Sequence, residues 1–227
     1  MGNGASVTRL TRATGGPAVL ATMAPKAPEP VPEPEPEGPD PRIATHVATL
    51  TNIKSKMEAK TEAARGLAFL AYSFPEQKAA ILEAAAIPPL VELVTRSEYS
   101  TCGSIEQSAG ALRMIASNDR ASMRAIRDAG GIAPLLAVLG DELSTDGQKM
   151  QAAGVLRALS FDDECKTAIR EAGGVEPLMA LAKEGTGEQK AFASLTLLNL
   201  EEVKELDVAY PDGAYVPPEE EPAAEGA

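Results

Sequence analysis

The side chains best suited to chemistry are few in this chain and lie far apart. It has one histidine, His46, and two cysteines, Cys102 and Cys165. A Cys–His nucleophile pair or a zinc site needs several such residues at recurring short spacings, which this sequence does not offer. The acidic run 162–164 opens a helical stretch, where negative charge stabilises the helix N-terminus. The sequence therefore predicts a protein that is not an enzyme and needs no metal or cofactor.

The N-terminus offers one residue for covalent modification. The chain begins MGNGAS, which matches the M-G-x-x-x-[ST] pattern for N-myristoylation on Gly2. A single myristoyl chain binds a membrane with an association constant of only about 10⁴ M⁻¹. No cysteine near Gly2 could carry a second acyl chain, so we expect weak and reversible membrane association.

Residues 1–28 also allow another interpretation. They contain arginine but no acidic residue and are rich in Ala, Thr and Ser, as organelle transit peptides are. Cleavage of a transit peptide would remove Gly2, so the two interpretations exclude each other. We expect a cytoplasmic protein at the periphery of a membrane, or an organelle protein if residues 1–28 are a transit peptide.

The composition excludes several classes of function. Lys and Arg number 21 against 33 Asp and Glu, which gives a net charge of −12. A nucleic-acid-binding protein needs a basic surface for phosphate, so this class is disfavoured. No apolar run approaches the ~20 residues of a membrane-spanning helix. Trp is absent and Phe and Tyr number four each, so any core must be aliphatic.

Changes in composition divide the chain into four segments. Residues 1–24 form an N-terminal segment that we expect to be disordered, and residues 25–41 alternate proline with acids as an extended spacer. Residues 42–206 hold a repeat domain of nearly balanced charge. Residues 207–227 carry six acids and no base, which is typical of a disordered acidic tail.

The repeat domain is marked by one motif that recurs. The string GGIAPLL at 130–136 returns as GGVEPLM at 173–179 and, more weakly, as AAIPPLV at 85–91, with spacings of 43 and 45 residues. The two small residues allow a sharp turn after one helix, and the proline fits the first turn of the next. A period of this length indicates a helical solenoid.

A second alignment predicts one long helix in each unit. Leucines 67, 112, 156 and 197 follow strings of small residues that let helices approach closely. Capping boxes before these helices are predicted at Ser55–Glu58, Ser104–Gln107, Thr145–Gln148 and Thr186–Gln189. Shorter helices at 75–84, 119–129 and 163–172 precede the recurring turns. Each full unit is thus a short helix, a middle helix opened by proline and a long capped helix.

These units resemble the armadillo repeat, whose pattern runs roughly I-x-x-A-G-G-I-x-x-L-V-x-L-L followed by A-A-x-A-L-x-N-L. The resemblance covers about residues 42–203 and implies an all-α, right-handed superhelical solenoid of about four repeats. In the first unit His46 stands where the others have leucine. We expect it to be structural, because a terminal repeat needs a more polar outer face.

The resemblance implies that the long helices line a groove for an extended peptide or an amphipathic helix of another protein. At the positions where importin-like and catenin-like members hold a peptide with Trp and Asn, only Asn199 matches, so an importin-type receptor is disfavoured. Arg113 and Arg157 occupy equivalent positions and could pair with an acidic ligand. The groove candidates are Arg65, Phe69, Arg113, Met114, Arg157, Phe192, Leu195 and Asn199.

The expected function is a protein–protein interaction adaptor without small-molecule substrate. An acylated start before armadillo repeats is similar to the plan of the myristoylated vacuolar armadillo adaptors of fungi, which have many more repeats. Two alternatives remain at this point: a soluble cytosolic or nuclear adaptor, and an accessory subunit of a larger assembly such as a ubiquitin ligase.

Overall fold

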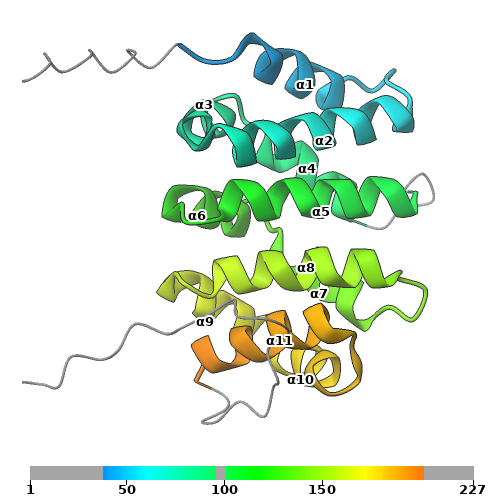
Figure 1. Ribbon diagram of the computed structural model, residues 1–227, viewed down its shortest axis with the longest axis vertical. Coiled ribbons are helices and arrows are strands. Elements are labelled where there is room, and N and C mark those ends of the chain that lie inside the picture. The colour runs from blue at the N-terminus through cyan, green and yellow to red at the C-terminus, as the bar shows by residue number, and fades with distance from the viewer. Residues whose placement is uncertain (1–37, 96–100, 202–227) are drawn as a thin grey trace, which may run out of the picture. The chain divides into compact units, whose positions relative to one another are not determined.

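A computed structural model describes residues 38–95 and 101–201 of this chain, and within these ranges the backbone is helical without strands (Figure 1). The helices, in chain order, are α1 Pro41–Thr51, α2 Met57–Ser73, the 3₁₀ turn η1 Pro75–Gln77, α3 Lys78–Glu83, α4 Ile87–Val94, α5 Cys102–Ala116, α6 Arg120–Asp128, α7 Ile132–Gly140, α8 Asp146–Leu159, α9 Asp163–Glu171, α10 Val175–Glu184 and α11 Gly187–Asn199. Gly2, residues 3–37 and the acidic segment 207–227 lie outside the described residues.

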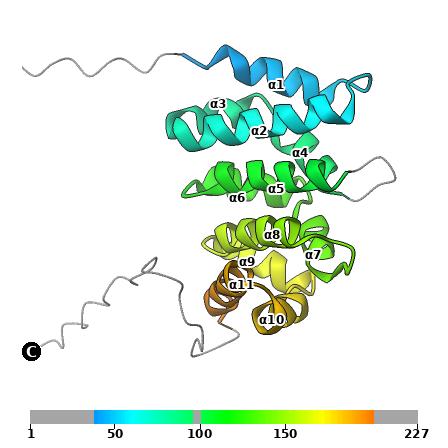
Figure 2. The same cartoon turned by 45° about the vertical axis from the view of Figure 1, so that its right-hand side comes forward.

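The helices repeat in threes, as the sequence predicts. Three full units run α3–α4–α5, α6–α7–α8 and α9–α10–α11, and the pair α1–α2 forms an incomplete first unit. The long helices α2, α5, α8 and α11 pack side by side in this order (Figures 1 and 2). The short and middle helices of each unit lie behind them in Figure 1 or at their ends. Side chains separated by about 43 residues therefore come together on neighbouring helices.

Aliphatic side chains fill the space between successive units. The aligned leucines Leu67, Leu112, Leu156 and Leu197 are all 2% exposed or less. Alanines one turn earlier, such as Ala64, Ala109 and Ala153, are fully buried and let the long helices approach one another. Each unit thus buries its apolar face against the next, which is how a solenoid is stabilised without a single central core.

The glycine pairs have two different roles in the turns. Gly130 and Gly173 have φ of +74°, a left-handed conformation that costs other residues about 1–2 kcal/mol. A Cβ atom on Gly174, the second glycine of its pair, would lie 2.7 Å from Ile169 Cγ2 and 2.8 Å from the Ile169 carbonyl oxygen. The first glycine of the pair therefore permits the turn, and the second permits close packing.

Two of the four predicted capping boxes are wrong. Helix α5 begins at Cys102, three residues earlier than its predicted box requires, and its box joins Thr101 to Ser104. Helix α2 begins at Met57, so Glu58 is only its second residue and cannot serve as the third residue of a box. The boxes at Thr145–Gln148 and Thr186–Gln189 are confirmed.

Candidate functional site

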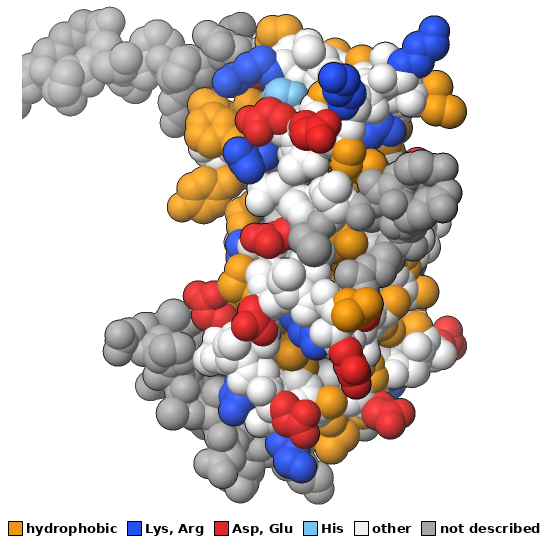
Figure 3. All heavy atoms as spheres, turned by 90° about the vertical axis from the view of Figure 1, so that its right-hand side faces the viewer, with side chains coloured by type: hydrophobic (Ala, Val, Ile, Leu, Met, Phe, Trp, Pro, Cys, Tyr) orange, Lys and Arg blue, Asp and Glu red, His pale blue; other side chains and the backbone are white. Residues whose placement is uncertain are grey.

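The candidate site is the surface formed by the long helices α2, α5, α8 and α11, here called the groove face. It is the side turned to the viewer in Figure 1, and it forms the hollowed left edge of the space-filling view in Figure 3. The predicted groove residues lie on all four helices: Arg65 and Phe69 on α2, Arg113 and Met114 on α5, Arg157 on α8, and Phe192, Leu195 and Asn199 on α11.

Arg157 is the most distinctive of these residues. Its guanidinium carbon lies 5.8 Å from the centroid of the Phe161 ring and 5.9 Å from that of Phe192. Both contacts fall within the range of cation–π attraction, which holds the guanidinium between two helices. The Nε atom of Arg157 is buried and has no hydrogen-bond partner within the described residues. The two rings hold the guanidinium in place, and its Nε atom makes no hydrogen bond to the described residues.

Arg113 lies next to this group. Its Nε donates to Gln151 Oε1 at 2.8 Å, which orients the side chain across the junction of α5 and α8. Burial lowers the pKa of Arg113, and the charge of Arg157 lowers it further, while Glu188 opposes both effects. A Cβ on Gly154 would lie 2.4 Å from Arg113 Cδ, so this glycine leaves space for the arginine stem.

Asn199 and Leu195 offer less to a ligand than their positions suggested. Asn199 Nδ2 donates to Ser160 Oγ at 2.8 Å, so one of its amide hydrogens is used inside the solenoid. Leu195 is only 9% exposed. Arg65 is well exposed and forms an ion pair with Glu62 at 3.2 Å, as neighbours on one helix commonly do.

The α2 end of the groove face carries exposed aromatic side chains in addition to Arg65. Phe69 is 55% exposed and packs edge-to-face against Phe74, with ring centroids 6.4 Å apart. Tyr72 is 74% exposed on the same helix, and half-buried Met114 follows on α5. Exposed aromatic side chains in a group are typical of binding surfaces. Tyr72, Phe74 and Phe161 were not predicted as site residues, although the closeness of Phe69, Tyr72 and Phe74 in an aromatic-poor sequence was a usable signal.

The described residues provide little for other kinds of site. Among them, no group of three or more His, Cys, Asp and Glu side chains is placed to hold a metal ion. Cys165 is buried, its thiol donates to the Met123 carbonyl at 3.7 Å, and burial together with nearby Asp162 raises its pKa to about 12. None of the helices in residues 38–95 and 101–201 combines the length and the hydropathy of a membrane span.

Comparison with solved structures identifies proteins of the same architecture. An engineered protein matches with a TM-score of 0.63 and 31% identity, over 70% of this chain and 62% of its own. A designed armadillo repeat protein in complex with the peptide (KR)4 matches with a TM-score of 0.61 and 24% identity, over 69% and 63% of the two chains. The armadillo repeats only protein from Plasmodium falciparum matches with a TM-score of 0.52 and 21% identity, over 63% and 60%.

This chain therefore covers less than two thirds of the length of each of these proteins. Comparison with protein-family models gives no match, and comparison with curated proteins gives none either.

Proposed function

The described residues form an armadillo repeat solenoid, and on this premise we propose that the chain is a protein-interaction module that binds a segment of another polypeptide on its groove face. The observation that carries the proposal is Arg157, held between Phe161 and Phe192 with a buried Nε that has no partner in the described residues. Arg157 as a whole is only half-buried, so a ligand carboxylate can reach the exposed part of its guanidinium, and charge-assisted bonds to arginine are strong.

The character of the groove face defines the partner segment that it fits. Arg113 and Arg157 favour an acidic residue over α8, whereas Phe69 and Met114 favour an apolar residue over α2 and α5. A short extended segment or one amphipathic helix with acidic and apolar residues would satisfy both ends. The designed neighbour that holds a (KR)4 peptide supports peptide binding by this architecture, with a ligand of opposite charge.

The test starts from peptides selected on the full chain from a displayed random library. We expect the selected peptides to share an acidic residue and an apolar residue. The double substitution Arg113→Glu and Arg157→Glu should weaken their binding at least tenfold in a fluorescence polarisation assay, because it turns attraction into repulsion. Arg120→Glu makes one such charge reversal on an exposed residue of α6 and serves as the control for each single substitution, Arg113→Glu and Arg157→Glu. Equal affinities for the wild type and the double variant would contradict the proposal.

Reversible membrane attachment through Gly2 is a finer part of the proposal. It is supported by the M-G-x-x-x-S start and by the Pro/Glu-rich stretch at 25–41, which would hold the repeats away from a membrane. Metabolic labelling with an alkyne myristate should mark the wild type and leave Gly2→Ala unmarked. A mature N-terminus near residue 30 in mass spectrometry would instead support a transit peptide.

A further inference from the structure

Two successive junctions between repeats differ in a way that points to a second binding site. At the junction of α6 and α9, Arg124 Nε donates to Asp162 Oδ2 at 3.0 Å, and Arg127 forms an ion pair with Glu164. Asp162 is 1% exposed and also caps α9 through the Cys165 N–H at 3.2 Å. This junction is closed by two arginines from one unit that contact acids of the next.

The preceding junction, between α3 and α6, has lost both arginines. By the register of the repeats, Ala79 stands in the place of Arg124 and Leu82 in the place of Arg127. The acid that corresponds to Asp162 is retained as Asp119, whereas Ala121 replaces Glu164. Asp119 caps α6 by accepting from the Ser122 N–H at 3.1 Å, and it forms no ion pair within the described residues. This junction therefore keeps the carboxylate but has no arginine paired with it, and the nearby cation is the Lys78 ammonium.

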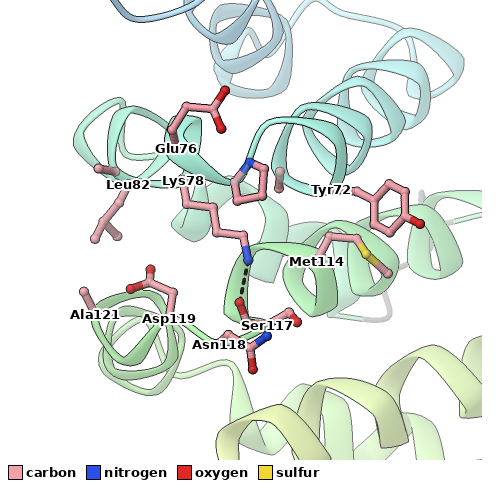
Figure 4. A pocket seen from close by; sticks show the side chains of 12 residues that line it. Tyr72, Glu76, Lys78, Leu82, Met114, Ser117, Asn118, Asp119 and Ala121 are labelled. Atoms are coloured by element: carbon pink, nitrogen blue, oxygen red, sulfur yellow. Dashed lines mark hydrogen bonds between the residues drawn. The ribbon is translucent and has the colours of Figure 1, made fainter. Parts of the chain in front are cut away.

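A pocket of about 490 Å³ occupies this place (Figure 4). The four residues of this junction that were compared with the next junction all line the pocket: Ala79, Leu82, Asp119 and Ala121. In Figure 4, Asp119 lies beside Ala121 and below Leu82, on the side of the pocket where α3 and α6 meet. The rest of its lining combines apolar side chains, among them Pro75 and Met114, with the polar residues Glu76, Lys78, Ser117 and Asn118.

The charges around the pocket favour a cation. Lys78 is the basic residue of the lining, and its ammonium donates to the Ser117 carbonyl at the C-terminal end of α5 (Figure 4). Burial lowers the pKa of this lysine, and the Asp119 charge opposes that effect. Glu76 adds a second carboxylate at the exposed rim. With Asp119 and Glu76 against one lysine, the lining carries a net charge of −1, and the negative end of the α5 dipole adds to it.

We propose that this pocket binds an arginine side chain of a partner polypeptide, whose guanidinium takes beside Asp119 the place that Arg124 takes beside Asp162. The methylene stem of the arginine packs against Leu82, which lies next to Asp119 in the pocket (Figure 4). An anionic ligand such as a phosphate meets two carboxylates here and is disfavoured. The proposal rests on the proposed function in requiring a protein partner, but its charged group is Asp119 rather than the Arg113–Arg157 pair, and the pocket shares its apolar edge, at Met114, with the groove face.

The test uses the isotope-labelled full chain and a minimal probe, N-acetyl-arginine amide, titrated by nuclear magnetic resonance. We expect the shifts to concentrate on the amides of residues 117–122, and N-acetyl-norleucine amide to cause less than a third of them. Asp119→Asn should weaken probe binding about fivefold or more, because it removes the charge, whereas asparagine still caps a helix N-terminus well. Asp162→Asn, at the closed junction, is the matched control and should leave probe binding unchanged.

A second variant fills the pocket from within. Ala79 is exposed, so Ala79→Arg can place the chain's own guanidinium beside Asp119, and it should abolish the shifts caused by the probe. Probe binding by Ala79→Arg or by Asp119→Asn at wild-type strength would overturn the proposal. If the probe binds only after Arg9 and Arg12 are both replaced by glutamine, the chain's own N-terminal segment occupies the pocket. That result would overturn the proposal that a partner is the occupant. These outcomes do not depend on the Arg113→Glu and Arg157→Glu test. A failure of this proposal can therefore be distinguished from a failure of the proposed function.

Discussion

The second unit and the two units that follow it build the same turn with different residues. At 130–131 and 173–174 the turn is Gly-Gly, and the second glycine N–H donates to the carbonyl of Ile126 or Ile169 at 2.9 Å. At 85–86 it is Ala-Ala: Ala85 has φ of +55°, and the corresponding bond from Ala86 to Ile81 lengthens to 3.3 Å. The alanine turn shows that the fold tolerates a Cβ at both positions, but with a left-handed alanine and a longer hydrogen bond.

The same contrast extends across the surface. The junction that follows the alanine turn is open, with a pocket and exposed aromatics, whereas the next is closed by arginine–acid pairs. The open junction thus offers apolar and acidic surface to a ligand, whereas the arginines of the closed junction are already paired with acids and the guanidinium offered on the groove face is that of Arg157. One short solenoid thereby presents an acidic and apolar surface and a basic surface about one repeat apart.

The largest effect should come from forcing the alanine arrangement on a glycine turn. Gly174→Ala places a Cβ 2.8 Å from the Ile169 carbonyl oxygen, a backbone atom that cannot move aside alone. We expect a loss of about 2 kcal/mol in the free energy of unfolding, as overpacking of a filled site commonly costs. Urea denaturation followed by circular dichroism measures it. A loss below about 0.5 kcal/mol would mean that the two turns are equally loose.

A smaller effect of opposite sign is expected at the alanine turn. Ala85→Gly relieves a left-handed alanine and should stabilise the chain by about 0.5–1 kcal/mol. Gly130→Ala, at the equivalent position, creates the same strain and should destabilise it by about 1 kcal/mol. Thermal unfolding of both variants measures these changes. A shift of the melting temperature in the same direction for both variants would contradict the account.

The first unit should also make stability depend on pH through His46. Burial lowers the pKa of His46 below its usual value of about 6.5, and Arg42 lowers it further, while Asp40 and Glu62 oppose the shift. The folded state then binds fewer protons than the unfolded state, so this stabilising contribution is complete above pH 6.5 and is lost as the pH falls below it. Unfolding measured at pH 7 and pH 5 should show a smaller loss for His46→Gln than for the wild type. The same loss in both proteins would remove His46 as the cause.

The smallest effect should come from closing the open junction. Ala79→Arg is expected to stabilise the chain by about 0.5 kcal/mol, within the range of exposed ion pairs. The matched substitution Arg124→Ala opens the closed junction and should cost more, because the partner Asp162 is 1% exposed and would lose its cation. Thermal unfolding of both variants measures the two changes in stability. A larger change for Ala79→Arg than for Arg124→Ala would contradict the expectation that the buried partner Asp162 makes the second change larger.

The fold was predictable from the sequence because its signals are local and repeated. The GGI and GGV turns, the aligned leucines and two of the capping boxes fix helix starts and ends without knowledge of contacts. The α5 start was missed by three residues because Thr101 and Ser104 can both cap a helix, and Ser104 serves instead as the third residue of the box that begins at Thr101.

The candidate site was predictable only in part. Arg113 and Arg157 were found from their equivalent positions in the repeats, but their environment depends on Phe161, Phe192 and Gln151, which belong to other turns or helices. The open pocket was readable only after Ala79 and Leu82 had been compared with the arginines one repeat later. The inward roles of Asn199 and Leu195 depend on the exact rotation of α11 and could not be read from spacing.

The most direct test of the central claim is a crystal structure of the full chain with a peptide selected on it. The account predicts a peptide carboxylate within hydrogen-bonding distance of the Arg157 guanidinium, between Phe161 and Phe192, with the peptide running along α5, α8 and α11. A peptide bound to the middle helices α4, α7 and α10, with Arg157 untouched, would contradict it.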